Sequence, residues 1–527
     1  MTDHASASRG APLLLALDSG TSVVKAVAFD ATGEQIAARA RPNRVRHRAD
    51  GGVEQDMAQS WTDAVAVLAE LVAALPPGRE IAALAVTGQG DGTWLADADG
   101  APVAPAWLWL DARAASLVAA LRETEGARRA FAHTGSGLNA CQQSSQLLWL
   151  ARHQPEILAR SATAFHCKDW LYFNLTGMRA ADPSEACFTF GDWRTRAYAE
   201  AVLEALALTA CRRLLPPIVD GTRQWHGLAP AVARAIGLPA GLPVVLGYVD
   251  VVCTALGGGL YGAGEAGVSI LGSTGMHLRL AMRPADVRPN PAMTGYCMVF
   301  PVPGAVMQAE SNMAATLNID WLARLVGEAA ALAGAPPPPD LPARLGEAAA
   351  AARPGAMLFH PFISTAGERG PFTDPAARAA LFGFDQRAGI AELARAVFEG
   401  LGFAARDCYA AMGDLPPEIR ITGGAAKSPL MRAILAACLA RPVRVIAQPE
   451  AGAAGAAMIA ALSVGLYPSL DACAARWITP RLGRSEPADG ELASLYARLY
   501  PLYRDAYRAL QPTWQRLATL REGKTDA

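Results

Sequence analysis

The segment "DSGTSVVK" near the N-terminus contains the residue types that bind a phosphate group. A turn at Gly20, Thr21 and Ser22 would present backbone N–H groups and two hydroxyls to an anion, and Lys25 would add a positive charge. Asp18 would repel phosphate directly, but it is well placed if a divalent cation lies between them. The alternative interpretation is an ordinary hairpin whose turn is solvated.

Two later glycine turns could bind other parts of the same ligand. In "LGSTG", Gly272, Thr274 and Gly275 form a second small concavity suited to phosphate. In "ITGGAAKSPL", Gly423 and Gly424 precede a helix that we expect to begin near Ser428, and helix N-termini accept close approach by nucleotides. The third turn lacks the glycine spacing of a Walker A loop, so that interpretation is rejected.

These turns lie in an alternating pattern of strands and helices that is typical of α/β proteins. Residues 12–30 and 267–280 share one plan, an apolar strand, a turn and a second strand, so we expect two similarly built lobes. The predicted domains are residues 11–247 for the first lobe, 248–480 for the second lobe and 481–527 for a helical extension. Helices are expected over 58–75, 146–159 and 197–208, and the Pro-rich segment 333–344 is expected to be an exposed loop.

Composition limits the classes of partner. The chain has 527 residues and a net charge of -1, so no overall basic field steers it toward nucleic acid. Nine scattered cysteines without a C-x-x-C pair indicate reduced, buried thiols and a cytoplasmic protein. The apolar run 451–467 is shorter than the ~20 residues that span a bilayer, which favours a buried helix over a membrane segment. We therefore expect a small-molecule partner, with a homodimer left open.

Seven motifs occur in the order found in one enzyme family. These are "LDSGTSVVK", "VEQD", "VTGQGDG", "WLWLDAR", "GYVDVVCTALGGGL", "LGSTG" and "ITGGAAKSPL", and the match extends over residues 12–470. The chain thereby resembles the FGGY carbohydrate kinases of the actin and hexokinase-like superfamily. The resemblance implies two ribonuclease-H-like lobes that close over ATP in a cleft between them.

The resemblance also implies roles for individual residues. Asp250 would be the general base, and it ends the apolar segment "VVLGYVD", where a carboxylate is costly unless it is turned into a cleft. A helix N-cap is the alternative role for Asp250. Asp18 would be linked to Mg²⁺. The residues expected to bind ATP are Gly20, Thr21, Ser22, Lys25, Gly272, Thr274, Gly275, Gly423, Gly424, Ala425 and Ser428.

We expect the acceptor site in the first lobe. Gln89 and Asp91 lie on a glycine turn after a buried strand, where they can accept hydrogen bonds from adjacent hydroxyls. Trp109, Asp111 and Arg113 alternate, so in an extended segment they share one face, and an indole wall with polar neighbours suits a polyol. The alternative is a structural Asp111–Arg113 pair over a core tryptophan. Trp94 and Trp107 are expected in the core.

Two departures from the family pattern affect the choice of substrate. Gln146 replaces the lysine of the family's Lys-x-x-Trp element, and Val251 replaces the glutamine that glycerol kinases have beside the base. The segments "VTGQGDGTWL" and "PAWLWLDARAAS" are most similar to family members that phosphorylate erythritol, so the resemblance implies this polyol as acceptor. A pentulose kinase specific for ribulose or xylulose, and a non-catalytic nucleotide or sugar sensor, are the alternatives.

Overall fold

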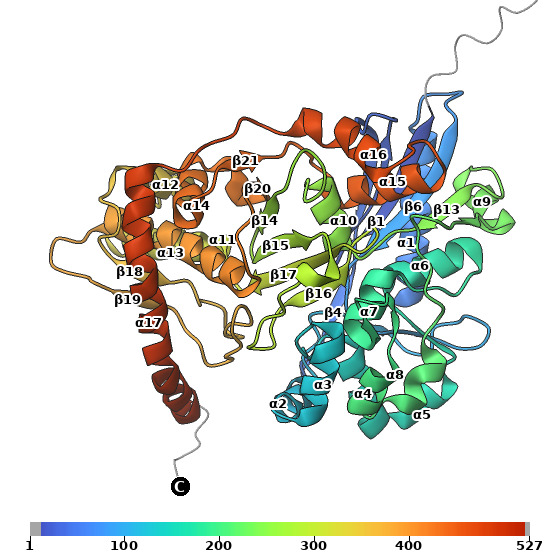
Figure 1. The fold of residues 1–527 in the computed structure, drawn as a ribbon, viewed down its shortest axis with the longest axis horizontal. Helices are drawn as coiled ribbons and strands as arrows, with labels where there is room; N and C mark the ends of the chain where they lie inside the picture. Colours follow the sequence, from blue (N-terminus) through green and yellow to red (C-terminus); the bar gives the residue numbers. More distant parts are fainter. Residues whose placement is uncertain (1–11, 522–527) are drawn as a thin grey trace, which may run out of the picture.

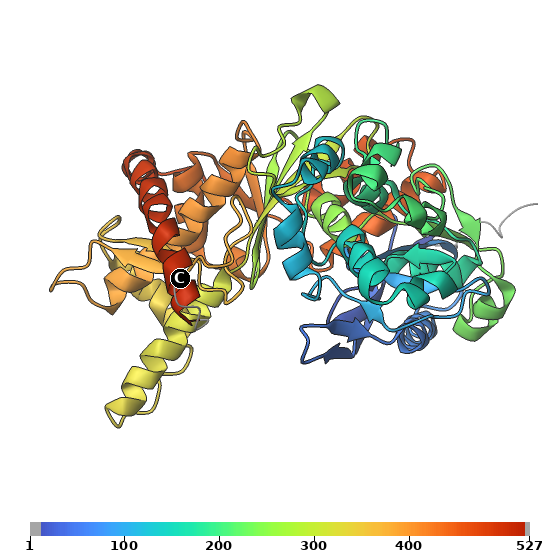
Figure 2. The same cartoon turned by 90° about the horizontal axis from the view of Figure 1, so that it is seen from below.

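The computed structural model describes residues 12–521, which form two lobes that each contain a six-stranded sheet (Figures 1 and 2). Residue 11, at the start of the expected first domain, and residues 522–527, at the end of the expected extension, lie outside the described part. The prediction of an α/β fold with two lobes is confirmed.

The first sheet contains the N-terminal hairpin. Its strand order is β12-β13-β6-β1-β2-β3; β2 pairs with β1 and β3 antiparallel, and β6 pairs with β1 and β13 parallel. The strands are β1 Leu13–Ser19, β2 Val23–Phe29, β3 Gln35–Pro42, β6 Ile81–Gly88, β12 His226–Gly227 and β13 Pro243–Leu246. Because β1, β6 and β13 run parallel, their carboxyl ends meet at one edge of the sheet, where Asp18 and Gln89 lie.

Helices cover both faces of this sheet because side chains of β1 alternate between two cores. Leu15 and Leu17 pack with α1, whereas Leu14 and Ala16 pack with α10 and α15. The covering helices are α1 Met57–Ala73, α6 Cys167–Thr176 and α9 Pro230–Ile236 on one side, and α10 Asp250–Gly257 and α15 Ala451–Ser463 on the other. Residues 451–461 of α15 are all buried, which confirms the predicted buried helix.

The second sheet repeats the plan of the first. Its order is β16-β17-β15-β14-β20-β21, with β15 antiparallel to β14 and β17, and with β20 parallel to β14 and β21. The strands are β14 Gly267–Leu271, β15 Gly275–Ala281, β16 Tyr296–Val299, β17 Val306–Asn312, β20 Ile419–Thr422 and β21 Val443–Val445. The two hairpins predicted from the sequence therefore occupy equivalent places in two related sheets.

Helices and two short strands complete the second lobe. They are α11 Thr316–Leu332, α12 Leu341–Ala351, β18 Leu358–His360, β19 Ala380–Phe382, α13 Ile390–Ala411, α14 Pro429–Leu439 and α17 Gly490–Arg521, with 3₁₀ turns at Pro284–Asp286 and Gly424–Lys427. α16 Leu470–Trp477 and a 3₁₀ turn at Thr479–Arg481 pack on the first lobe instead, where the Trp477 ring contacts Phe29 of β2. The long α17 packs buried Tyr496, Tyr500, Tyr503, Tyr507 and Trp514 against this lobe. Figure 2 shows α11 and α12, in yellow, extending away from the rest of the lobe.

The remaining elements of the first lobe include three small sheets, with strand orders β4-β5-β8, β7-β9 and β10-β11. They are β4 Val45–His47, β5 Val53–Gln55, β7 Trp94–Ala96, β8 Ala106–Trp107, α2 Ala115–Leu121, α3 Glu125–Thr134, α4 Gln143–His153, α5 Pro155–Arg160, β9 Thr163–Phe165, α7 Pro183–Phe190, β10 Gly191–Asp192, β11 Ala197–Tyr198, α8 Glu200–Ala205 and a 3₁₀ turn at Thr209–Leu214.

One of the three predicted helices matches the structure closely, and the other two differ from it in their bounds. The helix expected over 58–75 is α1, but the one expected over 146–159 is two helices, because Pro155 lacks the N–H group that would continue α4. The helix expected over 197–208 begins with a strand and shortens to α8. The segment 333–344, expected to be an exposed loop, is irregular only to residue 340; residues 341–344 begin α12, and 342–344 are exposed.

Three smaller predictions can also be compared with the fold. Trp94 and Trp107 are buried, as expected for core residues. All nine cysteines are buried and unpaired, as their spacing indicated. Across residues 12–521, none of the helices combines the length and apolar character needed to cross a bilayer.

Candidate active site

One cavity lies where glycine turns of the two lobes face each other, and a second cavity lies within the second lobe. The first, here called the acceptor cavity, has a volume of about 350 Å³ and takes residues from both lobes. Its lining includes Thr21, Gly90, Asp91, Trp109, Phe188, Val249, Asp250, Val251 and Thr254, followed by Ile270, Gly272, Thr274, Met276, Tyr296, Met298 and Arg369. The second, here called the apolar cavity, has about 610 Å³ and is lined by α11, α12 and the third glycine turn.

The first glycine turn connects β1 to β2 and is closed by a bond from the Gly20 N–H to the Val23 carbonyl, at 3.0 Å. Asp18 and Lys25 are paired in register on these antiparallel strands, so their side chains lie on one face. Lys25 Nζ lies 2.9 Å from Glu450, the residue that precedes α15. The hairpin is therefore anchored to α15 beside the cleft.

Asp18 lies beside α10, the helix that begins at Asp250. A Cβ atom at Gly452 would lie 2.7 Å from Asp18 Oδ2 and 3.2 Å from Thr254 Oγ1, and Thr254 lines the acceptor cavity with Asp250. Burial raises the pKa of Asp250 to about 8, and the negative charges of Asp18 and Glu185 add to the rise. Burial likewise raises the pKa of Asp18 to about 6, although the Lys25 charge opposes it.

The placement of Asp250 differs from the expectation of a strand that ends on an acid. β13 ends at Leu246, and Asp250 is the first residue of α10, with Val249 as its N-cap. The Val249 N–H donates to Ser184 Oγ at 3.2 Å, so a contact from α7 fixes the start of α10. Asp250 is thus held at a helix N-terminus and not at a strand end.

The second glycine turn lines the acceptor cavity, the third lines the apolar cavity, and the two turns lie next to each other. Gly272 and Thr274 line the acceptor cavity, while the Thr316 N–H donates to the Gly272 carbonyl at 3.0 Å and Thr316 itself lines the apolar cavity. Gly423, at φ 92°, packs so closely that a Cβ atom would lie 2.6 Å from the Leu271 carbonyl oxygen. A ligand reaching from one cavity to the other would pass along these turns.

The predicted adenosine-binding residues lie in the apolar cavity. Gly424, Ala425 and Ser428 are part of its wall, together with Phe398 and Pro429. Ser428 is the N-cap of α14 and its Oγ accepts from the Met431 N–H at 3.2 Å, which confirms the expected helix start. The mainly apolar wall suits a flat heterocycle.

The residues predicted to bind the acceptor separate into two groups. Asp91 and Trp109 line the acceptor cavity, and Trp109 Nε1 donates to Thr21 Oγ1 at 2.6 Å. Gln89 is buried behind the turn, where Thr21 Oγ1 donates to it at 3.1 Å. Gln89 and Trp109 therefore hold Thr21 from two sides, and only Trp109 also faces the cavity.

The expected shared face of Trp109, Asp111 and Arg113 does not form, because β8 ends at Trp107 and the chain turns after it. Asp111 instead pairs with Arg113 at 2.6 Å, and the Arg113 guanidinium carbon lies 3.4 Å from the centre of the Trp107 ring. This arrangement is the alternative stated above, a structural pair over a core tryptophan.

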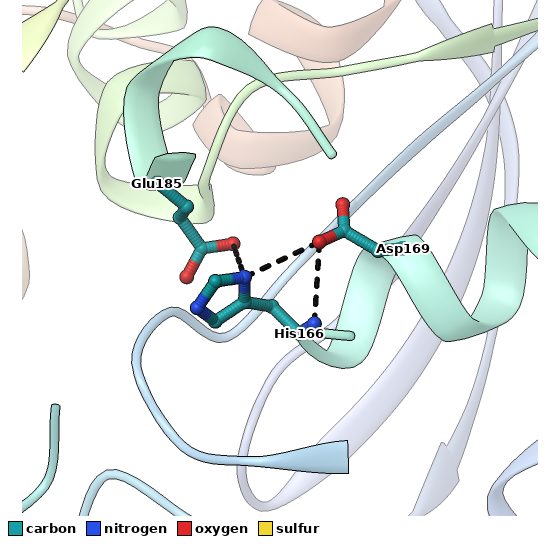
Figure 3. Close-up of side chains that lie close together, drawn as sticks. All are labelled: His166, Asp169 and Glu185. Atoms are coloured by element: carbon teal, nitrogen blue, oxygen red, sulfur yellow. Dashed lines mark hydrogen bonds and ion pairs between the residues drawn. The ribbon is translucent and has the colours of Figure 1, made fainter. Parts of the chain in front are cut away.

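A network of buried charges supports the acceptor cavity from behind. Lys168 Nζ contacts Asp169 at 2.9 Å, Asp182 at 2.6 Å and Glu185 more closely still. Figure 3 shows His166, Asp169 and Glu185 converging, with His166 Nδ1 at 3.2 Å from Asp169. The single Lys168 ammonium contacts all three carboxylates, and burial raises the pKa of Glu185 to about 7.

This network reaches the site through one hydrogen bond. Glu185 Oε1 accepts from the Asp91 N–H at 2.9 Å. Asp91 also has φ 54°, a left-handed conformation that this bond helps to fix. The sequence alone does not predict that Lys168, Asp182 and Glu185 meet, because their contact depends on how α6 and α7 are placed relative to each other.

Sequence reasoning missed the cavity residues supplied by the second lobe, chiefly Tyr296, Met298 and Arg369. A single sequence gives no signal that β16 borders a cleft with the first lobe. For Arg369 a signal existed, because "GERGP" places two charged residues between glycines and a proline, where a loop with a function is a reasonable expectation.

Comparison with known proteins identifies the family. The model of the N-terminal domain of the FGGY family of carbohydrate kinases matches residues 13–257, and the model of its C-terminal domain matches residues 267–464. The chain belongs to the FGGY family of carbohydrate kinases. Membership makes it a kinase for a small carbohydrate, and kinases of this kind use ATP as phosphoryl donor.

Two relatives of this carbohydrate kinase match most of its length. Erythritol kinase of Brucella abortus is 51% identical over 513 residues, covering 96% of this chain and 98% of the relative. Xylulose kinase of Escherichia coli is 32% identical over 431 residues, covering 80% of this chain and 84% of the relative.

Solved structures of other kinases share the fold. Xylulose kinase of Rhodospirillum rubrum superposes with a TM-score of 0.85 at 27% identity, covering 95% of this chain and all of that chain. Gluconate kinase of Lactobacillus acidophilus gives 0.88 at 20% identity over 96% of this chain and all of the other, a likeness of fold alone.

Proposed function

We propose that this carbohydrate kinase transfers the γ-phosphoryl group of ATP to a terminal hydroxyl of erythritol, with Asp250 as general base. The observation that carries the proposal is the 51% identity to Erythritol kinase of Brucella abortus over nearly the whole of both chains. The xylulose kinase relative, at 32%, is more distant. A cavity of about 350 Å³ with Asp91, Trp109 and Asp250 on its wall has the polar and aromatic groups that a small polyol requires.

The arrangement of the cavities supports a path for the nucleotide. The adenosine would occupy the apolar cavity beside Gly424, Ala425 and Ser428, with Gly423 next to it in the same turn. Its phosphates would pass along Gly272 and Thr274, which line the acceptor cavity, and the adjacent Gly275. The terminal phosphate would meet the first-lobe turn, where Gly20, Thr21 and Ser22 offer backbone N–H donors, Ser22 offers a hydroxyl donor and Lys25 adds a positive charge.

The residues at the junction would then perform the transfer. Asp250 accepts the proton of the terminal hydroxyl as its oxygen approaches the phosphorus atom in line with the leaving oxygen. Trp109 covers the apolar C–H edge of the polyol, and Asp91 accepts hydrogen bonds from its other hydroxyls. The walls of both lobes exclude water, which would otherwise compete as acceptor.

Asp18 fits the role of magnesium ligand. Its carboxylate is partly buried, and among residues 12–521 no basic group lies within the 4 Å that defines an ion pair. A carboxylate in this setting suits a hard divalent cation that also binds phosphate oxygens. When bound, Mg²⁺ and ATP supply the phosphoryl group and neutralise its negative charge.

Other assignments accompany this proposal. The domain division at 247/248 and 480/481 stays a prediction, and α10 and α15 pack on the first sheet although both belong to the second expected domain. A cytoplasmic location is supported by the nine unpaired cysteines. A homodimer is an open prediction.

A coupled ADP-release assay with ATP and magnesium tests the function. The panel contains erythritol, glycerol, ribulose and xylulose at several concentrations. We expect kcat/KM for erythritol to exceed that for each other acceptor by about tenfold or more, because missing or misplaced hydroxyls leave polar groups of the site unpaired. A higher value for ribulose or xylulose would replace erythritol with a pentulose, and ADP release from none of them would favour a sensor.

The variant Asp250→Asn separates chemistry from binding in the same assay. We expect turnover to fall by on the order of a hundredfold or more, because the amide cannot accept the proton, while ATP binding measured by calorimetry is retained. A near-normal turnover would remove Asp250 as the base.

A further inference from the structure

Arg369 brings a positive charge from the second lobe into the acceptor cavity. It lies in the loop between β18 and β19, and its side chain lines the cavity together with Asp91 of the first lobe. The loop is held in place because Glu368 Oε1 accepts from the Met313 N–H at 2.9 Å. The two charged groups thus reach one cavity from opposite halves of the molecule.

Neither charge has a full set of protein partners. Arg369 Nε donates to Ser311 Oγ at 3.0 Å, but across residues 12–521 no carboxylate lies within 4 Å of its guanidinium nitrogens. Asp91 Oδ1 is buried and has no hydrogen-bond partner in the described structure. Asp91 Oδ2 has only long contacts, 3.4 Å from the Tyr296 hydroxyl and 3.5 Å from Cys141 Sγ.

Incomplete pairing of this kind is costly unless a ligand completes it. A buried carboxylate oxygen without a donor loses the hydration it had in water. Burial raises the pKa of Asp91, and the positive charges of His166 and Arg369 oppose that rise, so Arg369 acts on Asp91 without bonding to it. A neutral ligand that donates to one group and accepts from the other would satisfy both.

We propose that Arg369 and Asp91 together bind hydroxyl groups of the acceptor other than the one that reacts, and thereby select the length of the polyol. This inference rests on the proposed function. A hydroxyl can donate to Asp91 Oδ1 while its oxygen accepts an N–H of Arg369, and hydrogen bonds to charged groups are the strong ones. Erythritol has one non-reacting hydroxyl more than glycerol, so it can engage both residues more completely.

The pair also makes acceptor binding depend on both lobes. Asp91 is fixed in the first lobe by the Glu185 bond, whereas Arg369 belongs to the second, so the polyol is fully bound only when the lobes face each other. A sugar carrying a phosphate would be disfavoured, because Asp91 repels it and the neighbouring Asp250 adds a second acid to the wall.

Steady-state kinetics of Arg369→Gln on erythritol and glycerol tests the proposal. We expect kcat/KM for erythritol to fall roughly 10- to 100-fold, mainly through KM, while KM for ATP stays unchanged. The ratio of kcat/KM for erythritol to that for glycerol should decrease by at least fivefold, roughly the smallest change that a lost hydrogen bond to one hydroxyl would cause. Arg369→Lys should recover part of this ratio.

Double variants and a matched control complete the design. Asp91→Asn with Arg369→Gln should lose less than the product of the two single effects, because both residues bind the same hydroxyls. Arg387→Gln, which removes an exposed pair with Asp385 in the same lobe, should change neither KM. Equal losses on both polyols, or multiplicative effects in the double variant, would overturn the role of Arg369.

The outcomes distinguish this inference from the proposed function. If the wild-type enzyme does not phosphorylate erythritol, the proposed function fails before any variant is compared. If it does and Arg369→Gln keeps the wild-type ratio between the polyols, the function stands and the inference is wrong. Calorimetric titration of erythritol into each variant without ATP gives a second readout, in which Arg369→Gln should weaken binding.

Discussion

At the scale of single residues, Asp250 is the proposed general base, and its ionisation decides whether it can accept a proton. Its pKa of about 8 comes from burial first and from the charges of Asp18 and Glu185 second. The folded protein therefore keeps a proton that the unfolded chain loses near pH 4, so the contribution of Asp250 to the free energy of unfolding falls as pH rises between these values. A pKa near neutrality suits the proposed role of Asp250, because a base with such a pKa transfers protons well.

This ionisation predicts the pH dependence of the reaction. In the wild-type enzyme, kcat/KM for the polyol should rise with pH along a limb with an apparent pKa near 8, because only the Asp250 carboxylate accepts the proton. Initial rates at a series of pH values measure the limb. The residual rate of Asp250→Asn should lack it, and the same limb in that variant would assign the titration to another group.

At the scale of elements, the contact between α10 and α15 decides where Asp250 lies. The helices approach so closely that a Cβ atom at Gly455 would lie 1.9 Å from the Cys253 carbonyl oxygen, and one at Gly257 would lie 2.1 Å from the Ala451 carbonyl oxygen. Because α15 also packs on β1 and β6, this contact fixes the start of α10 relative to the strand that contains Asp18. Small residues are therefore required at the crossing.

Enlarging one of these residues should disturb both stability and catalysis. Gly455→Val forces the helices apart, with an expected cost of about 1–3 kcal/mol or more, seen as a lower midpoint of thermal unfolding and a reduced turnover. Gly490→Ala is the matched control, because a Cβ atom there meets nothing within 4 Å and the residue begins α17. Unchanged turnover in Gly455→Val would show that the crossing does not position Asp250.

At the scale of the whole molecule, the lobes touch beside the cavity as well as facing each other across it. The Gly137 N–H donates to the Gly295 carbonyl at 3.0 Å, and Asn139 Nδ2 donates to the Tyr296 hydroxyl at 3.1 Å. Tyr296 also lines the acceptor cavity, so the contact between lobes and the binding of the acceptor share a residue. Lobe closure and substrate binding are therefore expected to be coupled.

Small-angle scattering tests this coupling. With Asp250→Asn, which prevents turnover, the radius of gyration should decrease when magnesium, ATP and erythritol are all present and change less with either ligand alone. Gly137→Ala should prevent the decrease, because its Cβ atom would lie 2.2 Å from the Met293 carbonyl oxygen and hold the lobes apart. The same radius in all ligand states would contradict a closing motion.

The sequence by itself determined the fold class and the two hairpins with their glycine turns. These features depend on neighbours in the chain: an apolar strand followed by Gly20 to Ser22, or by Gly272 to Thr274, forms a hairpin whatever lies elsewhere. Local pattern also marked Asp18 and Asp250 as acids that end apolar segments, and Asp91 as an acid on a glycine turn after a buried strand. It could not fix the helix boundary at Pro155, where competing local signals overlap.

Only the tertiary structure decided which polar residues meet. Asp111 and Arg113 do not line the cavity, because they form an ion pair with each other and the Arg113 guanidinium lies over the Trp107 ring. The tertiary structure also brought Arg369 to Asp91 across 278 positions of the sequence, the difference between 369 and 91. The physical reason is that two lobes pack through many weak contacts between residues that are far apart in the sequence. No short sequence pattern therefore predicts which surfaces of the two lobes will face each other.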